Sequence, residues 1–151
     1  MNIPELKQET KSGSIVAQSA LGVCFLYGRD VEVNYKEAFR LLSAAAERGA
    51  SRAVVNLGRM FAEGLGVPKD LPQAIRHYKA VAKVELRAQL GLARIYSRAL
   101  GVPTDAKQAR KYYSLVAKAR NVVDDPATAA FAGAVTSDEV NEAKAYLAKA
   151  R

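Results

Sequence analysis

The chain has 151 residues, about the length of one domain, and half of them are apolar, so it can bury a core and is not a disordered chain. One cysteine, Cys24, and one histidine, His77, exclude an internal disulfide and Cys–His zinc sites. Lys and Arg total 23 against 15 Asp and Glu, and the net charge of +8 favours acidic partners.

The longest uncharged stretch, residues 12–28, does not resemble a membrane or targeting segment. It contains three serines and is shorter than the roughly 20 apolar residues of a spanning helix. Glu5 and Glu9 place acid where a signal peptide has a basic start. We expect a soluble chain, cytoplasmic or, if a leader has been removed, periplasmic.

A repeat of 35–36 residues organises the chain. A shift of 36 aligns Ala17, Leu21, Gly22 and Phe25 with Ala53, Leu57, Gly58 and Phe61. A further shift of 35 aligns the latter unit with Ala88, Leu92 and Tyr96, and Gly66-Val67-Pro68 with Gly101-Val102-Pro103. Recurrence of small and apolar residues at these spacings indicates copies of one structural unit.

The elements are predicted in chain order from this repeat. Residues 3–11 correspond to the end of a second helix. Each full unit then has a first helix, at about 14–27, 51–63 and 85–98, with apolar residues at helical spacing. Gly64 and Gly66 end such a helix, and Pro68 blocks its continuation. Asn34, Asp70 and Asp105 are placed to cap the second helices.

The C-terminal part departs from the repeat. Residues 126–135 form a shortened, alanine-rich first helix. Thr136 and Glu139 are spaced as a capping box that opens a last helix reaching about Ala150. A terminal unit must present a polar outer face, and we expect four residues to provide it: Asp138, Glu142, Lys144 and Lys149.

The sequence therefore predicts one all-α domain, residues 1–151. It is a right-handed α-solenoid of helix-turn-helix repeats, with three full units and half units at both ends. The units cover about 14–49, 50–84 and 85–120, and the C-terminal cap covers 121–151.

The repeated pattern resembles the SEL-like repeat (SLR), a relative of the tetratricopeptide repeat. Its best match is the second unit, through Ala53, Leu57, Gly58, Phe61, Gly64, Gly66, Val67, Asp70, Ala74 and Tyr78. The third unit departs at Ala93 and Ala99, and the first at Asp30, Glu32 and Asn34. The resemblance implies adaptor or scaffold work and, in bacteria, secretion-linked, host-contact or toxin-immunity roles.

The first helices of such a solenoid line its concave face. Residues 76–120 contain 11 basic residues and only two acids. Arginines in rows on that face would bind planar carboxylates through bidentate hydrogen bonds. We predict a basic groove that holds an acidic partner segment and packs it on apolar neighbours. The predicted partner-binding residues are Tyr27, Arg52, Val55, Asn56, Arg59, Arg87, Leu90, Arg94 and Arg98.

Two alternatives for this face stay open. The spacing of Arg52 and Asn56 resembles half of a carboxylate clamp in tetratricopeptide relatives, although Gly91 stands at the partner position. Alternatively, the face is solvated and its arginines pair with Glu63 and Glu85.

Other residues point to packing or capping rather than chemistry. Cys24 is predicted to be buried, His77 half-buried, and Tyr78 and Tyr113 to belong to the core. Asp124 and Asp125 precede a helix start and are expected to cap it. No catalytic residue, cofactor or metal site is predicted.

The predicted function is non-enzymatic protein–protein binding. The first alternative is an immunity-type inhibitor that neutralises a secreted bacterial toxin. The second is a polyanion or nucleic-acid binder, which the few aromatic residues and their core positions disfavour. The sequence leaves the partner and the oligomeric state open.

Overall fold

The computed structural model describes residues 2–98 and 102–149, so the predicted features at Ala99, Gly101 and Ala150 lie outside it. The described residues form nine helices: α1 (Ile3–Lys11), α2 (Ile15–Tyr27), α3 (Tyr35–Glu47), α4 (Ser51–Glu63), α5 (Leu71–Val81), α6 (Leu86–Ser97), α7 (Ala106–Ala117), α8 (Pro126–Ala132) and α9 (Ser137–Lys149).

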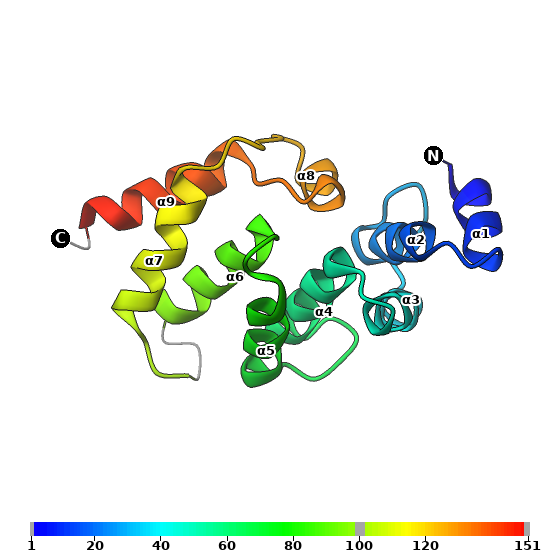
Figure 1. Ribbon diagram of the computed structural model, residues 1–151, viewed down its shortest axis with the longest axis horizontal. Coiled ribbons are helices and arrows are strands. Elements are labelled where there is room, and N and C mark those ends of the chain that lie inside the picture. The colour runs from blue at the N-terminus through cyan, green and yellow to red at the C-terminus, as the bar shows by residue number, and fades with distance from the viewer. Residues whose placement is uncertain (1, 99–101, 150–151) are drawn as a thin grey trace.

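The helices pack in successive pairs, α2 with α3, α4 with α5, and α6 with α7. Each pair stacks on the next, and the termini lie at opposite ends of the array (Figure 1). The predicted all-α helical repeat solenoid is confirmed. Its first helices are α2, α4 and α6: α8 packs against α2, and two glutamates of α9, which packs on α7, pair with arginines of α6. We call this side, formed by α2, α4 and α6, the inner face. The second helices α3, α5 and α7 form the outer face.

The same capping scheme begins each second helix. The side chains of Asn34, Asp70 and Asp105 each accept a hydrogen bond of 3.0 Å from the backbone N–H three residues ahead. The backbone N–H groups of these residues also reach back to the first helix. They donate to the carbonyls of Phe25, Phe61 and Tyr96 at 2.9, 2.8 and 2.9 Å. These caps therefore set the spacing within each unit.

Two glycines, Gly58 of the repeated Leu-Gly pair and Gly91 two positions before its equivalent Ala93, make room for a buried tyrosine. A Cβ atom at Gly58 would lie 2.7 Å from the Tyr78 ring, and one at Gly91 would lie 2.5 Å from it. Tyr78 itself is only 5% exposed. Glycine is therefore needed on both α4 and α6, where the ring of α5 fits between them.

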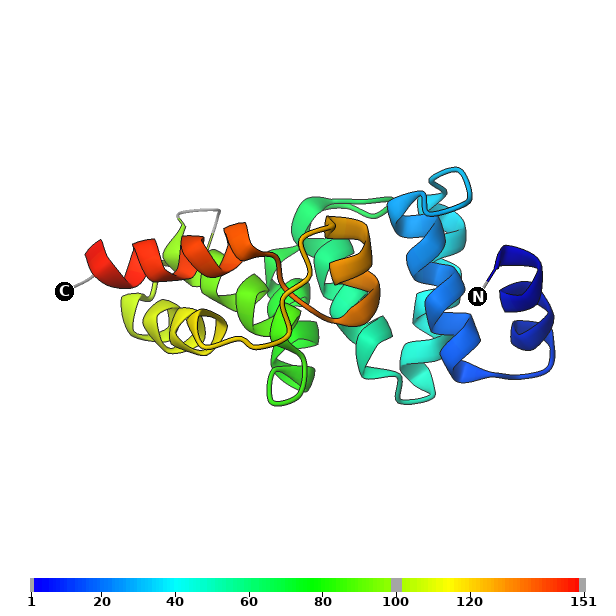
Figure 2. The same ribbon diagram turned by 90° about the horizontal axis from the view of Figure 1, so that it is seen from above.

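The segment containing α8 leaves the solenoid and returns to it. The N–H of Val123 donates to Val135 O at 2.9 Å, and the N–H of Val135 donates to Asn121 O at 3.2 Å. These bonds close the base of the excursion. Figures 1 and 2 show α8 reaching toward α2 across the inner side, while α9 runs beside α7.

Within residues 2–98 and 102–149, no helix combines the length and apolar character needed to cross a membrane.

Candidate functional site on the inner face

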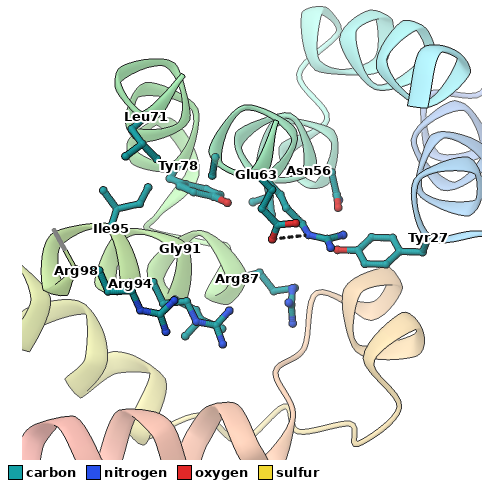
Figure 3. Close-up of a pocket in the computed structure, with 14 residues that line it drawn as sticks. Tyr27, Asn56, Glu63, Leu71, Tyr78, Arg87, Gly91, Arg94, Ile95 and Arg98 are labelled. Atoms are coloured by element: carbon teal, nitrogen blue, oxygen red, sulfur yellow. Dashed lines mark hydrogen bonds and ion pairs between the residues drawn. The ribbon is translucent and has the colours of Figure 1, made fainter. Parts of the chain in front are cut away.

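A pocket of about 170 Å³ opens on the inner face between α2, α4, α5 and α6. Eight of the nine predicted partner-binding residues line it, and Arg52 lies outside it, toward α8. Figure 3 shows Arg87, Arg94 and Arg98 on one side of the pocket and Tyr27 with Asn56 on the other. The structure therefore brings together residues from three repeat units.

The apolar members of the set are largely covered. Val55 is 3% exposed and Leu90 is 1% exposed, so they form the pocket floor and offer a partner little surface. Asn56 is also buried, and its Nδ2 donates to the Arg52 carbonyl at 2.8 Å within the same helix. This bond occupies one of the two N–H donors of the Asn56 amide within α4.

Arg94 and Arg98 hold a carboxylate of the chain's own C-terminal helix. Arg94 Nε and Nη2 donate to the two oxygens of Glu142 at 3.0 and 2.7 Å, and Arg98 Nη2 donates at 3.2 Å. The Tyr113 hydroxyl adds a bond of 2.9 Å. Burial, the largest single influence, raises the pKa of Glu142, but hydrogen bonds and charge from these partners together lower it.

Arg87 binds the beginning of the same helix. Its Nη1 and Nη2 donate to the two oxygens of Glu139 at 3.1 and 3.2 Å, and Nη1 also donates to Ala134 O at 2.9 Å. Glu139 Oε2 accepts from the N–H of Thr136 at 2.8 Å, and Thr136 Oγ1 accepts from the N–H of Glu139. The predicted capping box is confirmed, and its carboxylate has a second role as the Arg87 partner.

Arg52 holds the end of α8. Its Nη1 donates to Phe131 O at 2.6 Å. Gly133 follows with φ +69°, and a Cβ there would lie 2.5 Å from the Arg52 guanidinium. The Arg52 Nε lies 3.4 Å from Glu85, which is 5% exposed and accepts from Ser51 Oγ at 2.5 Å. A buried carboxylate therefore holds the arginine that receives α8.

Arg59 is paired within the solenoid. Its Nε donates to Glu63 at 3.2 Å, and its guanidinium carbon lies 4.5 Å from the centre of the Tyr27 ring. Burial opposes the charged form of Arg59, but Tyr27 and Glu63 together raise its pKa.

Pairing of the inner arginines with Glu63 and Glu85 is thus confirmed for Arg59 and Arg52. The prediction that Glu142 belongs to the polar, solvent-facing side of the C-terminal cap is wrong. Its carboxylate points to Arg94 and Arg98. Sequence reasoning also missed Glu139 as a partner of Arg87. The spacing of three between the two glutamates was the available signal, since it places both on one face of a helix.

The residues predicted to serve packing or capping do so, except that Asp124 does not cap α8: its carboxylate accepts from the N–H of Ser137 at 2.9 Å, at the start of α9. Cys24 is buried, His77 is half-buried and lies 5.3 Å from the Phe61 ring, and Asp125 caps α8. In the described part of the chain, no group of three or more His, Cys, Asp or Glu side chains is placed to hold a metal ion.

Comparisons with known proteins agree with this architecture. The Sel1 repeat model matches residues 15–49, 51–83 and 86–121. The crystal structure of a Sel1 repeat protein from Oxalobacter formigenes is 32% identical, covers 97% of both chains and has a TM-score of 0.65. The structure of c5321, a protective antigen of uropathogenic Escherichia coli strains with an SLR fold, is 29% identical and has a TM-score of 0.70. It covers 99% of this chain and 33% of that one.

Among curated proteins, DAP3-binding cell death enhancer 1 of mouse and of rat is 34% identical over 77 residues, or 51% of this chain. The match spans only 15% of the length of those relatives. Three repeat matches and a similar structure over nearly the whole length give one conclusion: the chain belongs to the Sel1 repeat family, whose fold is a protein–protein interaction module.

Proposed function

We propose that the chain is a non-catalytic interaction module whose inner face binds an acidic segment of a partner protein. The observation that carries this proposal is intramolecular. Arg87, Arg94 and Arg98 already hold two carboxylates one helical turn apart, Glu139 and Glu142. A partner helix with the same spacing offers the same planar acceptors to the same donors.

Such a partner competes with α9 for the arginines. The apparent affinity for an acidic segment is therefore lower than the intrinsic affinity, in proportion to the fraction of molecules whose arginines are released. The adjoining pocket remains accessible beside them and contains Arg59 and Tyr27. We propose that a partner enters at this pocket. It then displaces Glu142 from Arg98, which is half-exposed.

The absence of catalysis is part of the proposal. The inner-face arginines and glutamates are engaged in ion pairs with one another, and burial raises the pKa of the Cys24 thiol, which disfavours a nucleophilic thiolate. The immunity-type inhibitor is a narrower form of the same activity.

A labelled peptide copying residues 134–149 tests the proposal by fluorescence anisotropy. We expect saturable binding to the full chain, and at least tenfold weaker binding of the same peptide with Gln at both glutamate positions. The chain variant E139Q/E142Q loses its internal competitor and should bind the acidic peptide at least fivefold more tightly.

The matched variants are R94E/R98E on the inner face and R76E/K83E on the outer face. R94E/R98E should no longer bind the acidic peptide, and R76E/K83E should bind it as the unchanged chain does. If R94E/R98E does not fold, R98Q tests the same contact, because Arg98 is half-exposed and makes a single bond to Glu142. Equal binding of the acidic and Gln peptides, or equal losses in both charge-reversal variants, would overturn the proposal.

A further inference from the structure

The excess positive charge of residues 76–120 lies on the outer helices α5 and α7 and just beyond their C-terminal ends. Of the 11 cations in residues 76–120, Arg87, Arg94 and Arg98 are paired on the inner face. The other eight are exposed and make no ion pair within 4 Å among the residues that the structure describes: Arg76, Lys79, Lys83, Lys107, Arg110, Lys111, Lys118 and Arg120.

The outer helix of the first unit differs. On α3, the Arg40 guanidinium donates to both oxygens of Glu37 at 3.1 and 2.9 Å, and Glu47 adds a second acid to the helix. Neither α5 nor α7 contains an acidic residue. The two basic residues of α3 are therefore balanced by two acids, whereas α5 and α7 contain basic residues alone.

Two of the outer lysines lie near aromatic rings. Lys79 Nζ lies 5.8 Å from the centre of the Tyr96 ring, and Lys111 Nζ lies 5.2 Å from that of Tyr112. The two rings are nearly parallel, at 10°, with centres 6.3 Å apart. Ammonium groups from α5 and α7 thus lie around one tyrosine pair, within the range of cation–π attraction.

An apolar pocket of about 490 Å³ opens beside this tyrosine pair. Ile75 of α5, Tyr96 of α6, and Val102 with Pro103 from the connection to α7 contribute to its walls. One acid, Asp105, also lines the pocket, and its carboxylate accepts the N–H of Gln108 at 3.0 Å as the cap of α7. Apolar walls next to unpaired cations suit a ligand that combines an apolar group with negative charge.

We infer that this outer surface binds an acidic protein segment whose carboxylates meet the cations of α5 and α7 and whose apolar side chain enters the pocket. Charge complementarity selects the acidic partner. The apolar pocket favours a protein segment over nucleic acid, and the tyrosines give bases no platform because Tyr112 is buried and each ring has a lysine near it. The surface is separate from the inner face, so the module has two binding faces.

Two labelled peptides test this inference. In the first, a central leucine is flanked by four glutamates on each side; in the second, glycine replaces the leucine. The leucine peptide should bind the full chain at least fivefold more tightly, because part of its side chain leaves water. The variant I75S should abolish this difference. If I75S does not fold, as judged by circular dichroism, V102S alters the same pocket from the loop.

The charge contribution is tested with K79Q/K111Q, which should weaken both peptides at least fivefold. The matched control K7Q/K11Q removes two exposed lysines from α1 and should change binding less than twofold. R98Q should also leave these peptides unaffected, which separates this surface from the inner face.

Three outcomes would overturn the inference. Equal affinity for the leucine and glycine peptides would show that the pocket is not used. Equal losses in K79Q/K111Q and K7Q/K11Q would show unspecific attraction to net charge. An oligothymidylate of equal charge that binds more tightly, through the same two lysines, would assign the surface to nucleic acid instead.

Discussion

The inner and outer faces of the solenoid have the same sign of charge but use it differently. All five inner cations are arginines, and each one is within 4 Å of a carboxylate. Five of the eight outer cations in the second and third units are lysines, and none has such a partner in the described chain. Arginine suits planar, partly buried ion pairs, whereas the ammonium of lysine is strongly hydrated and remains at the surface.

This difference shows what a net charge can and cannot indicate. The basic composition of residues 76–120 drew attention to the inner arginines, yet those are the cations that the chain itself neutralises. The uncompensated charge lies on the opposite face. Changes of charge on the two faces should therefore affect the free energy of unfolding to different extents or in opposite directions.

The largest effect is expected for R94E. The new carboxylate would face Glu142 and Glu139, whose distances to the Arg94 guanidinium are now 2.7 and 3.7 Å. We expect the free energy of unfolding to fall by about 2–3 kcal/mol, measured by urea denaturation. The control R76E on the outer face should change it by less than about 0.5 kcal/mol. Similar losses for both would remove the distinction between the faces.

The second effect is the coupling between Arg94 and Glu142. A double-mutant cycle with R94Q and E142Q should give a favourable interaction of about 1 kcal/mol, because the pair is bidentate and partly buried. The corresponding cycle with Lys83 and Glu142 should give no coupling. A value near zero for the first cycle would mean that the ion pair orients α9 without adding to the free energy of unfolding.

The third effect is a pH dependence of α9. Since the pKa of Glu142 is lowered in the folded chain, the unfolded chain takes up its proton more readily. Its stabilising contribution is therefore complete above the ordinary glutamate value of 4.5 and is lost as pH falls through the folded value. Amide exchange should show α9 losing protection before α5, which contains no acidic residue, as the pH is lowered below about 4.5. E142Q should remove this early loss; an unchanged profile would contradict the assignment.

The smallest effect concerns the outer cations. K83Q and K118Q remove exposed charges that have no partner, so relief of like-charge repulsion should stabilise the fold by a few tenths of a kcal/mol at low ionic strength. The gain in Tm should disappear at about 0.5 M salt, where the Debye length is only a few ångströms. Destabilisation by either change would reveal an ion pair on this face.

Local features of this protein were predictable from the sequence because neighbouring residues produce them. Asp70 and Asp105 cap their helices as expected, and the capping box of Thr136 and Glu139 forms at the predicted place. The repeat period also placed eight of the nine predicted residues around one pocket. It could not show that Val55 and Leu90 are covered, since burial depends on the packing of adjacent units.

The amino-acid sequence by itself determined the helix pairs, their caps and their stacking, because the same contacts recur every 35–36 residues. Only the tertiary structure decided which acids meet the inner arginines. Residues 122–136 lie beyond the three matched repeats, and the pairing of Val123 and Asn121 with Val135 sets the direction in which α9 returns. The ion pair between Arg94 and Glu142 spans 48 residues of chain, so no local pattern could have specified it.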